Sequence, residues 1–227
     1  MTKPGAHGDP PTDQNLREPL VQGATALGLD LRGGQIDALL AYLALIQKWN
    51  QVYNLTAVRE PQDMLTQHIL DSLAVLPSLR RHAPMAKRLL DVGSGAGLPG
   101  VVLAIANPNL QVTCLDAVAK KAAFIAQVAG SLGLLNLQSL HARVEALMPE
   151  AGQAWELICS RAFSSLTDFV VGSQNALAPG GLWMAMKGKP PQDEIGALPA
   201  DVEVFHVEQI QVPQLDVQRC LVWMRRR

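Results

Sequence analysis

The chain has 227 residues, of which 48% are hydrophobic, 17% are charged and only 4% are aromatic. This apolar content is enough for one large buried core, and because it is mostly Ala, Leu and Val it favours helices packed on buried strands over an all-β sandwich. The net charge of −1 gives no global reason to expect a nucleic-acid partner, so an enzyme acting on nucleic acid would need its basic residues gathered in one place.

The chain begins with MTKPGAHGDPPTDQN, for which we predict a disordered leader over residues 1–15. This stretch lacks the apolar segment of a signal peptide, and no apolar run approaches the ~20 residues that cross a membrane. We therefore expect a cytoplasmic protein. The cysteines, Cys114, Cys159 and Cys220, lie in apolar runs with no CxxC pair and no histidine at metal-ligand spacing. They are interpreted as buried free thiols, and no metal site is expected.

Residues 16–84 are predicted to form an N-terminal helical extension packed on the same domain. Apolar residues recur there at the spacing of one helix face: Leu39, Leu40, Leu43 and Ile46. Gly33-Gly34 interrupts the chain before this helix. A further helix is predicted from Pro61, a residue favoured in the first turn, to Pro77, which is expected to end it.

Two groups of side chains in this region invite a functional interpretation. His68 and Asp71 lie three residues apart on one helix, so their side chains can meet. We favour a structural contact over a catalytic pair. Trp49, Tyr53 and Asn54 end the preceding helix, and packing on the core is favoured over stacking on a flipped-out base.

From residue 85 to residue 227, short apolar runs alternate with helical stretches. This alternation predicts a doubly wound, mostly parallel sheet covered on both faces. The expected strands are RLLDVG, QVTCLD, LQSLHA, WELICS, GGLWMAMKG, VEVFHVEQI and RCLVWMRR. The last three have few helices between them, which indicates an antiparallel edge. The predicted fold class is α/β and Rossmann-like, a seven-stranded sheet with an N-terminal helical cap.

The central motif is LLDVGSGAGLPG at residues 89–100. A buried strand runs into glycines that open a helix, which is where open α/β sheets bind nucleotides. One register, Gly95, Gly97 and Gly100, fits the dinucleotide pattern GxGxxG, with Asp116 about 20 residues further on. Taken alone, this register permits an NAD-dependent oxidoreductase.

The second register starts at Asp91 and runs through Gly93, Gly95 and Gly97 as DxGxGxG. A carboxylate just before the glycines adds like charge beside a pyrophosphate. The same carboxylate suits the methionine end of S-adenosylmethionine, which carries an ammonium and a sulfonium. We therefore favour a methyltransferase over a dehydrogenase.

Residues after the next two predicted strands fit the remainder of that cofactor. Asp116 can accept hydrogen bonds from both ribose hydroxyls. Val144 can pack on adenine, while Glu145 or its backbone meets the polar edge of the base. Each alone has a structural alternative, because Asp116 could cap the next helix and Glu145 could be a first-turn acid.

Several methyltransferase chemistries lack their motifs here. There is no [DN]PP[FY] pattern of exocyclic-amine enzymes and no Pro-Cys nucleophile of the pyrimidine-C5 type; Ser160-Arg161-Ala162-Phe163 stands in that place. The runs LLDVGSGAGLPGVVLAI, LDAVAKKAAFI, RVEAL, SRAFSSL and MKGK, with KWNQVYNLTAV and HILDSLAVLP upstream, resemble the ribosomal RNA small subunit methyltransferase G family, also called glucose-inhibited division protein B. The resemblance covers residues 20 to 225, nearly the whole chain.

The resemblance implies transfer of a methyl group from S-adenosylmethionine to N7 of one guanine in small-subunit (16S) rRNA. N7 carries a lone pair and no proton, so no general base is expected and catalysis would come from positioning. The implied partner is small-subunit rRNA, free or within a ribosomal particle, and we expect a monomer. The rivals are a class I methyltransferase acting on another substrate and an RNA-binding factor without turnover.

The candidate site residues fall into three sets. Those expected to position the substrate are Arg161 and Arg143. Those expected to bind the cofactor are Gly93, Gly95, Leu98, Asp116, Val144, Glu145 and Arg161. Those expected to bind RNA are Lys120, Arg143, Lys187 and Arg219. The resemblance implies most of these residues: Gly93, Leu98, Val144, Glu145, Lys120, Arg143, Arg161 and Arg219. Lys187 follows from its place after the fifth predicted strand; a solvated surface charge is the alternative for both lysines.

Overall fold

The structure, a computed structural model, describes residues 12–150 and 152–227. The leader predicted for residues 1–15 lies outside the described residues up to residue 11. Helix α1 (Thr12–Ala26) begins four residues before the expected start of the helical region at residue 16. None of the helices in the described ranges is long and apolar enough to cross a membrane.

The core of the fold is a seven-stranded sheet in the order β3-β2-β1-β4-β5-β7-β6. The strands are β1 (Arg88–Val92), β2 (Gln111–Asp116), β3 (Leu137–His141), β4 (Trp155–Ser160), β5 (Leu177–Lys187), β6 (Val202–Ile210) and β7 (Arg219–Arg226). The first five are parallel, and β7 is antiparallel to both β5 and β6. The predicted mostly parallel sheet with an antiparallel edge is confirmed.

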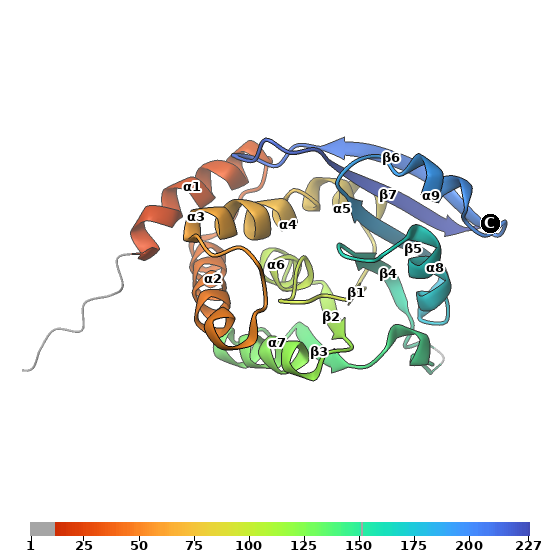
Figure 1. Ribbon diagram of the computed structural model, residues 1–227, viewed down its shortest axis with the longest axis horizontal. Helices are drawn as coiled ribbons and strands as arrows, with labels where there is room; N and C mark the ends of the chain where they lie inside the picture. The colour runs from red at the N-terminus through yellow and green to blue at the C-terminus, as the bar shows by residue number, and fades with distance from the viewer. Residues whose placement is uncertain (1–11, 151) are drawn as a thin grey trace, which may run out of the picture.

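Helices cover both faces of this sheet (Figure 1). One hydrophobic cluster joins α1, α2 (Gly33–Tyr53), α6 (Gly100–Ala106) and α7 (Ala119–Leu132) to one face. A second cluster lies on the other face with α8 (Leu166–Ser173), near the short α9 (Gln192–Gly196). The central strands β1 and β4 are almost wholly buried because both of their faces are covered. The N-terminal helices therefore share one core with the sheet.

The helical region between α2 and β1 is more broken than predicted. It consists of α3 (Pro61–Met64), a π-helical turn η1 (Leu65–Leu70), α4 (Asp71–Leu73) and α5 (Leu76–His82). The expectation that Pro77 ends a helix is wrong, since Pro77 lies in the first turn of α5. Proline fits there because the first-turn N–H groups have no partner within the helix.

Two smaller predictions about buried residues are confirmed. All three cysteines are buried and free. The rings of Trp49 and Tyr53 stack with centroids 5.2 Å apart and pack against the main hydrophobic cluster. The same prediction is wrong for Asn54, which is exposed and instead ends α2 in the left-handed region, at φ 48°.

Candidate functional site

The glycine loop after β1 presents an open backbone surface. Gly93 and Gly95 have φ angles of +67° and +61°, and a Cβ at either position would meet nothing within 4 Å. Gly100 is different, because a Cβ there would lie 2.4 Å from Cys114 Sγ. The first two glycines thus leave room for a ligand at the carboxyl end of the sheet, whereas Gly100 lets α6 pack closely on β1 and β2.

Asp91 lies beneath this loop instead of facing the cleft. Its side chain is fully buried, and Oδ2 accepts the N–H of Gly100 at 2.8 Å. Oδ1 is buried without a hydrogen-bond partner among the described residues. Burial raises the pKa of Asp91 to about 7, although the Gly100 N–H and Arg161 oppose that shift. The sequence argument placed this carboxylate beside the ammonium of the cofactor. In the structure it holds the start of α6.

Tyr42, on α2, binds the glycine loop from its buried side. Its hydroxyl donates to the carbonyl of Ala96 at 2.7 Å, and its side chain is completely buried. Burial raises the pKa of the Tyr42 phenol well above its ordinary value, so the hydroxyl keeps the proton that it donates. The N-terminal helices therefore contribute directly to the shape of the glycine loop.

The ends of β2 and β3 lie beside the glycine loop. Asp116 ends β2; its Oδ2 accepts the N–H of Gly95 at 2.9 Å, and its Oδ1 accepts the N–H of Val118 at 2.8 Å. Val144, in the short turn η2 (Val144–Ala146) after β3, is 4% exposed and packs in the second cluster, while Glu145 is exposed. The carboxyl ends of β1, β2 and β3 are adjacent in the sheet, so these residues lie along one edge.

This edge fits S-adenosylmethionine. The open backbone at Gly93 and Gly95 admits a ligand to main-chain atoms, and Leu98 provides buried apolar surface behind the loop. Asp116 is a nearly buried acceptor at the end of the neighbouring strand, the position from which a carboxylate can bind ribose hydroxyls. The three neighbouring strand ends thus offer an open glycine loop after β1, an acceptor at the end of β2 and an apolar residue after β3.

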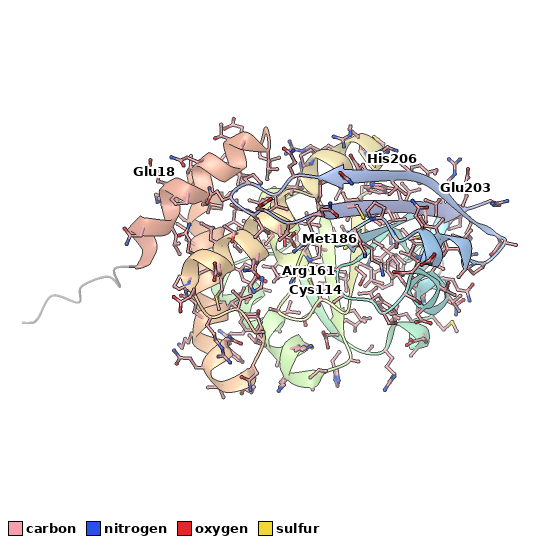
Figure 2. All side chains as sticks on the ribbon, turned by 45° about the horizontal axis from the view of Figure 1, so that its top comes forward. Glu18, Cys114, Arg161, Met186, Glu203 and His206 are labelled. Carbon is pink, nitrogen blue, oxygen red and sulfur yellow. The ribbon has the colours of Figure 1, made fainter. Side chains whose placement is uncertain are left out.

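A cavity lies beside α4, where β4 and β5 end and β7 begins. It has a volume of about 190 Å³ and is lined by Asp71, Arg161, Met186, Lys187, Gly188 and Arg219. Arg161 and Met186 are labelled together at the centre of the molecule in Figure 2. Arg161 follows β4, the neighbour of β1, so this cavity adjoins the glycine loop.

Asp71 holds the two arginines of this cavity. It is 1% exposed, and its Oδ1 accepts from Nε of Arg219 at 2.8 Å. Its Oδ2 accepts from Nη1 of Arg161 at 3.3 Å. Because one carboxylate faces two guanidinium groups, the cavity retains a net positive charge that suits an anionic or acceptor-rich ligand.

The π-helical turn η1 gives Arg161 a further partner. The N–H of Asp71 donates to the carbonyls of Thr66 and His68, so the carbonyl of Gln67 does not receive the hydrogen bond that a regular α-helix would give it. The Gln67 carbonyl accepts instead from Nη1 of Arg161 at 3.1 Å. π-helical turns are frequent at functional sites, and here one frees an acceptor for an arginine.

The predicted His68–Asp71 contact is wrong. His68 Nε2 lies 2.9 Å from the Thr56 hydroxyl, and Asp71 is occupied by the two arginines. Burial lowers the pKa of His68, so its imidazole is neutral at neutral pH. His68 anchors the loop after α2, and Asp71 belongs to the site.

The remaining candidate basic residues are Lys187, which lines the cavity, and Lys120 and Arg143, which lie near the ends of β2 and β3. Lys187, at the end of β5, places Nζ 2.8 Å from Oε2 of Glu194 on α9, so its charge is already paired. Lys120 and Arg143 are exposed near the carboxyl ends of β2 and β3. Across residues 12–150 and 152–227, neither makes an ion pair.

Sequence reasoning considered Asp71 only as a partner of His68, and it did not single out Tyr42 or Glu194. Helical spacing pointed from Asp71 to His68, because both arginine partners come from distant strands. Tyr42 belongs to an ordinary apolar helix face, and only its bond to Ala96 reveals its role. The available signal for Asp71 was its place within the apolar helical run HILDSLAVL at residues 68–76.

Comparison with known proteins was made by sequence and by structure. Residues 35–222 match the family model described as rRNA small subunit methyltransferase G. A protein from Acidovorax ebreus named ribosomal RNA small subunit methyltransferase G is 58% identical over 223 residues, covering 94% of this chain and 97% of the relative. A protein of the same name from Leptothrix cholodnii is 59% identical over 212 residues, covering 93% and 96%.

Similar solved structures include TrmN from Thermus thermophilus, with a TM-score of 0.53 and 19% identity over 72% of this chain and 53% of that one. A SAM-dependent methyltransferase from Aquifex aeolicus has a TM-score of 0.53 and 19% identity, covering 71% of this chain and 92% of its own. These likenesses concern the fold, and they confirm the predicted Rossmann-like methyltransferase fold class.

Proposed function

The chain belongs to the rRNA small subunit methyltransferase G family, and on that premise we propose that it transfers a methyl group from S-adenosylmethionine to N7 of a guanine in small-subunit (16S) rRNA. The observation that carries the proposal is the pair of arginines held by Asp71 in a cavity beside an open glycine loop. A methyl donor and an acceptor-rich base would meet between these two features.

The cofactor half of the site is assigned to the strand ends. Gly93 and Gly95 leave room for the cofactor to contact the loop backbone. Asp116 accepts hydrogen bonds from the ribose hydroxyls, and Val144 and Glu145 contact the adenine. When bound, S-adenosylmethionine supplies a methyl group on a positively charged sulfur. Arg161 is assigned to both halves of the site, because it follows the strand next to the glycine loop and lines the cavity that holds Arg219.

The substrate half of the site needs to position the guanine base and has no proton to remove from it. Guanine N7 already presents an in-plane lone pair, so the protein has no proton to remove before transfer. Arg161 and Arg219 are donors that suit guanine O6 or a flanking phosphate, and fixing either would align N7. Holding the two reactants in line accounts for large rate factors without a general base.

The RNA surface is assigned to the rim around the glycine loop and this cavity. Lys120 and Arg143 are exposed beside the cofactor cleft and are placed to meet phosphates. Arg143 contributes to substrate positioning by the same contact. Lys187 lies at the rim of the cavity, and it would contact RNA only by sharing or releasing Glu194.

The net charge of −1 argues against strong binding to arbitrary RNA. We therefore assign recognition to a folded rRNA element, presented within a ribosomal particle, and the acting species to a monomer. Light scattering across the working concentration range tests the monomer, and transfer to assembled subunits compared with free 16S rRNA tests the particle.

The test of the proposed function is transfer from tritiated S-adenosylmethionine to small ribosomal subunits from a strain that lacks this protein. We expect label in the 16S rRNA and none in ribosomal proteins, DNA or methylated subunits from the parent strain. Label in protein would contradict the RNA substrate. Cofactor binding without label in any RNA would contradict the enzyme and leave an RNA-binding factor.

A further inference from the structure

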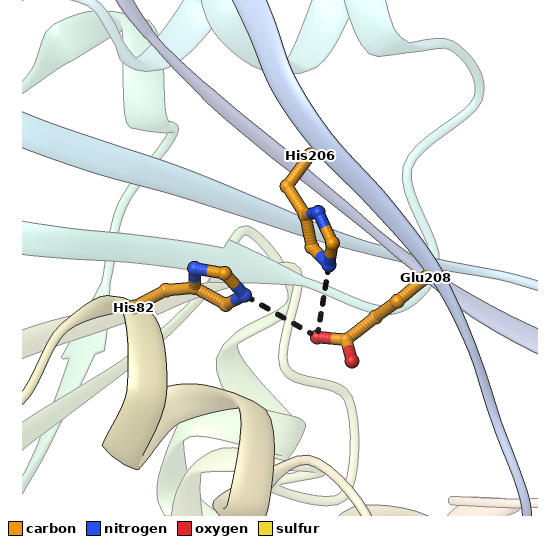
Figure 3. A group of neighbouring side chains, drawn as sticks. All are labelled: His82, His206 and Glu208. Carbon is orange, nitrogen blue, oxygen red and sulfur yellow. Dashed lines mark ion pairs between the residues drawn. The ribbon is translucent and has the colours of Figure 1, made fainter.

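Three potential metal ligands converge at the edge of the sheet, away from the cleft. His82 lies in the last turn of α5, and His206 and Glu208 lie on the edge strand β6. Their ligand atoms are all within 4.8 Å of one another. Figure 3 shows both imidazoles directed at the same carboxylate oxygen of Glu208. The donors therefore surround one point.

An irregularity in β6 brings two of these side chains to one face. The register with β7 shifts between Val204 and His206, so Phe205 is an extra residue in the strand. Val204 and Val207 both pack in the second cluster, whereas Phe205 packs in the main cluster. The bulge thus turns His206 and Glu208 toward α5, the face that regular alternation would have denied them.

The geometry of the cluster leaves its donors short of partners. His82 Nε2 lies 3.7 Å and His206 Nε2 lies 3.9 Å from Oε1 of Glu208, both too long for hydrogen bonds. His82 Nε2 is also buried and has no hydrogen-bond partner in the described part of the chain. With metal–ligand bonds of about 2.1 Å, ligands of a tetrahedral ion lie about 3.4 Å apart. The two separations from Glu208 are within a few tenths of an ångström of this value, and the two imidazoles, within 4.8 Å of each other, would move together on binding.

We propose that His82, His206 and Glu208 form a binding site for a divalent transition-metal ion of the zinc class. Two imidazole nitrogens and one carboxylate oxygen are borderline ligands, which favour Zn²⁺, Co²⁺ or Ni²⁺ over Mg²⁺ and Ca²⁺. Water fills the remaining coordination position. Sequence spacing gave no sign of this site, because its ligands come from elements more than a hundred residues apart.

Neighbouring groups orient the carboxylate. Ser78 donates to Oε1 of Glu208 and accepts the indole N–H of Trp223 at 2.9 Å. Arg81 binds Oε2, the other oxygen, so the lone pair of Oε1 that Ser78 does not use is left for the metal. These contacts fix the ligand from outside, as hydrogen bonds around metal ligands commonly do. The positive charge of Arg81 lowers the affinity, so we expect binding in the micromolar range.

The direction of the pKa shift at His82 suits metal binding. Burial is the largest cause that lowers the pKa of His82, and the nearby His206 lowers it further. Both effects favour a neutral imidazole at His82. The negative charge of Glu208 raises the pKa of His82, whereas the positive charge of Arg81 lowers it further. A neutral imidazole binds metals without first releasing a proton.

A metal here would join α5 to the edge strand. Arg81 and Glu208 also line a groove of about 1270 Å³ that extends along residues 208–219 to Arg219. The ion would therefore fix one wall of this groove and the strand that leads into the segment before Arg219. Its assigned role is structural.

The test is titration of chelator-treated, full-length protein with Zn²⁺ alone, followed by calorimetry and thermal melting. We expect one ion per chain and a rise in Tm. His82→Gln and His206→Gln should each weaken binding by at least about 100-fold, since even outer contacts are worth 10–100-fold. Co²⁺ in place of Zn²⁺ should give the visible absorption of a tetrahedral N/O site.

Glu203→Gln provides the matched control, because Glu203 lies on the same strand and pairs with Arg225 outside the cluster. It should bind Zn²⁺ like the unaltered protein. Melting curves in chelator show whether each variant is folded. Unchanged binding in folded His82→Gln and His206→Gln would overturn the site, and so would no binding at 100 μM Zn²⁺.

Discussion

Asp71 is a single buried carboxylate that faces two arginines from different strands. Asp71→Asn keeps the shape but leaves Arg161 and Arg219 without their counter-charge. We expect single-turnover methyl transfer to fall by about 10–100-fold, since misplacement by 1 Å can cost that much. Cofactor affinity should fall less than the transfer rate, because only Arg161 of the two arginines is also assigned to the cofactor half.

The control for Asp71 is Asp193→Asn, which removes an exposed carboxylate from α9. Its transfer rate should equal that of the unaltered protein. An Asp71→Asn variant that transfers at the full rate would show that the arginines hold their positions without this contact.

Asp91 makes the stability of the protein depend on pH. Its folded pKa is raised to about 7 from an ordinary 3.8, so between these values the folded chain holds a proton that the unfolded chain releases. The stabilisation from the neutral carboxyl is full below the unfolded pKa and is lost as pH rises through the folded pKa. The Asp91→Asn variant does not ionise at this position, so its stability does not fall for this reason as the pH rises.

Relative to the unaltered protein, Asp91→Asn should therefore gain up to about 3 kcal/mol in unfolding free energy between about pH 5 and about pH 8. Urea denaturation at both pH values measures the difference. A constant difference would mean that Asp91 does not titrate in this range. The position of Asp91 at the end of a strand was readable from the sequence, but its burial was not, because burial depends on how α6 packs above it.

At the scale of elements, α2 and the glycine loop are joined by one hydrogen bond. Tyr42→Phe removes the donor to the Ala96 carbonyl, which should cost about 1–2 kcal/mol in unfolding free energy. Cofactor affinity should fall as well, because the loop loses a support. Denaturant unfolding and calorimetric titration with S-adenosylmethionine measure the two effects.

Tyr53→Phe is the matched control, since Tyr53 is a half-buried tyrosine at the end of the same helix that stacks on Trp49 through its ring. It should retain both stability and affinity. Equal behaviour of the two variants would show that the Tyr42 hydroxyl does not support the loop.

The elements differed in how far the sequence could predict them. The strands and the helices α6 and α7 were predictable because runs of buried residues alternate with helical periodicity, and the turn glycines mark the boundary. The π-helical turn and the start of α5 at Leu76 were not, because one extra residue per turn leaves almost no mark on apolar spacing. Contacts such as Asp71 with Arg219 depend on strand order, which periodicity does not encode.

At the scale of the whole molecule, a chain with a net charge of −1 must bind RNA through a local rim. The double variant Lys120→Ala, Arg143→Ala should weaken binding to the small subunit. It should also reduce the slope of log affinity against log salt by about 1.5, since each lost phosphate contact contributes about 0.7–0.9. Filter binding at several salt concentrations gives the slope.

Lys87→Ala with Arg88→Ala is the control, because these residues lie at the start of β1, the opposite end of the strand from the glycine loop. Its salt slope should equal that of the unaltered protein. If both double variants lower the slope alike, RNA binding does not depend on the rim around the cleft.

The most direct test of the central claim is to locate the methyl group in rRNA. Small subunits methylated by the protein are treated with borohydride and aniline, which cleaves the chain at N7-methylguanosine. We predict one new cleavage in 16S rRNA, absent with Arg161→Ala, whose cofactor binding and folding are measured in parallel. Methyl label in the RNA without any such cleavage would contradict N7 of guanine as the acceptor.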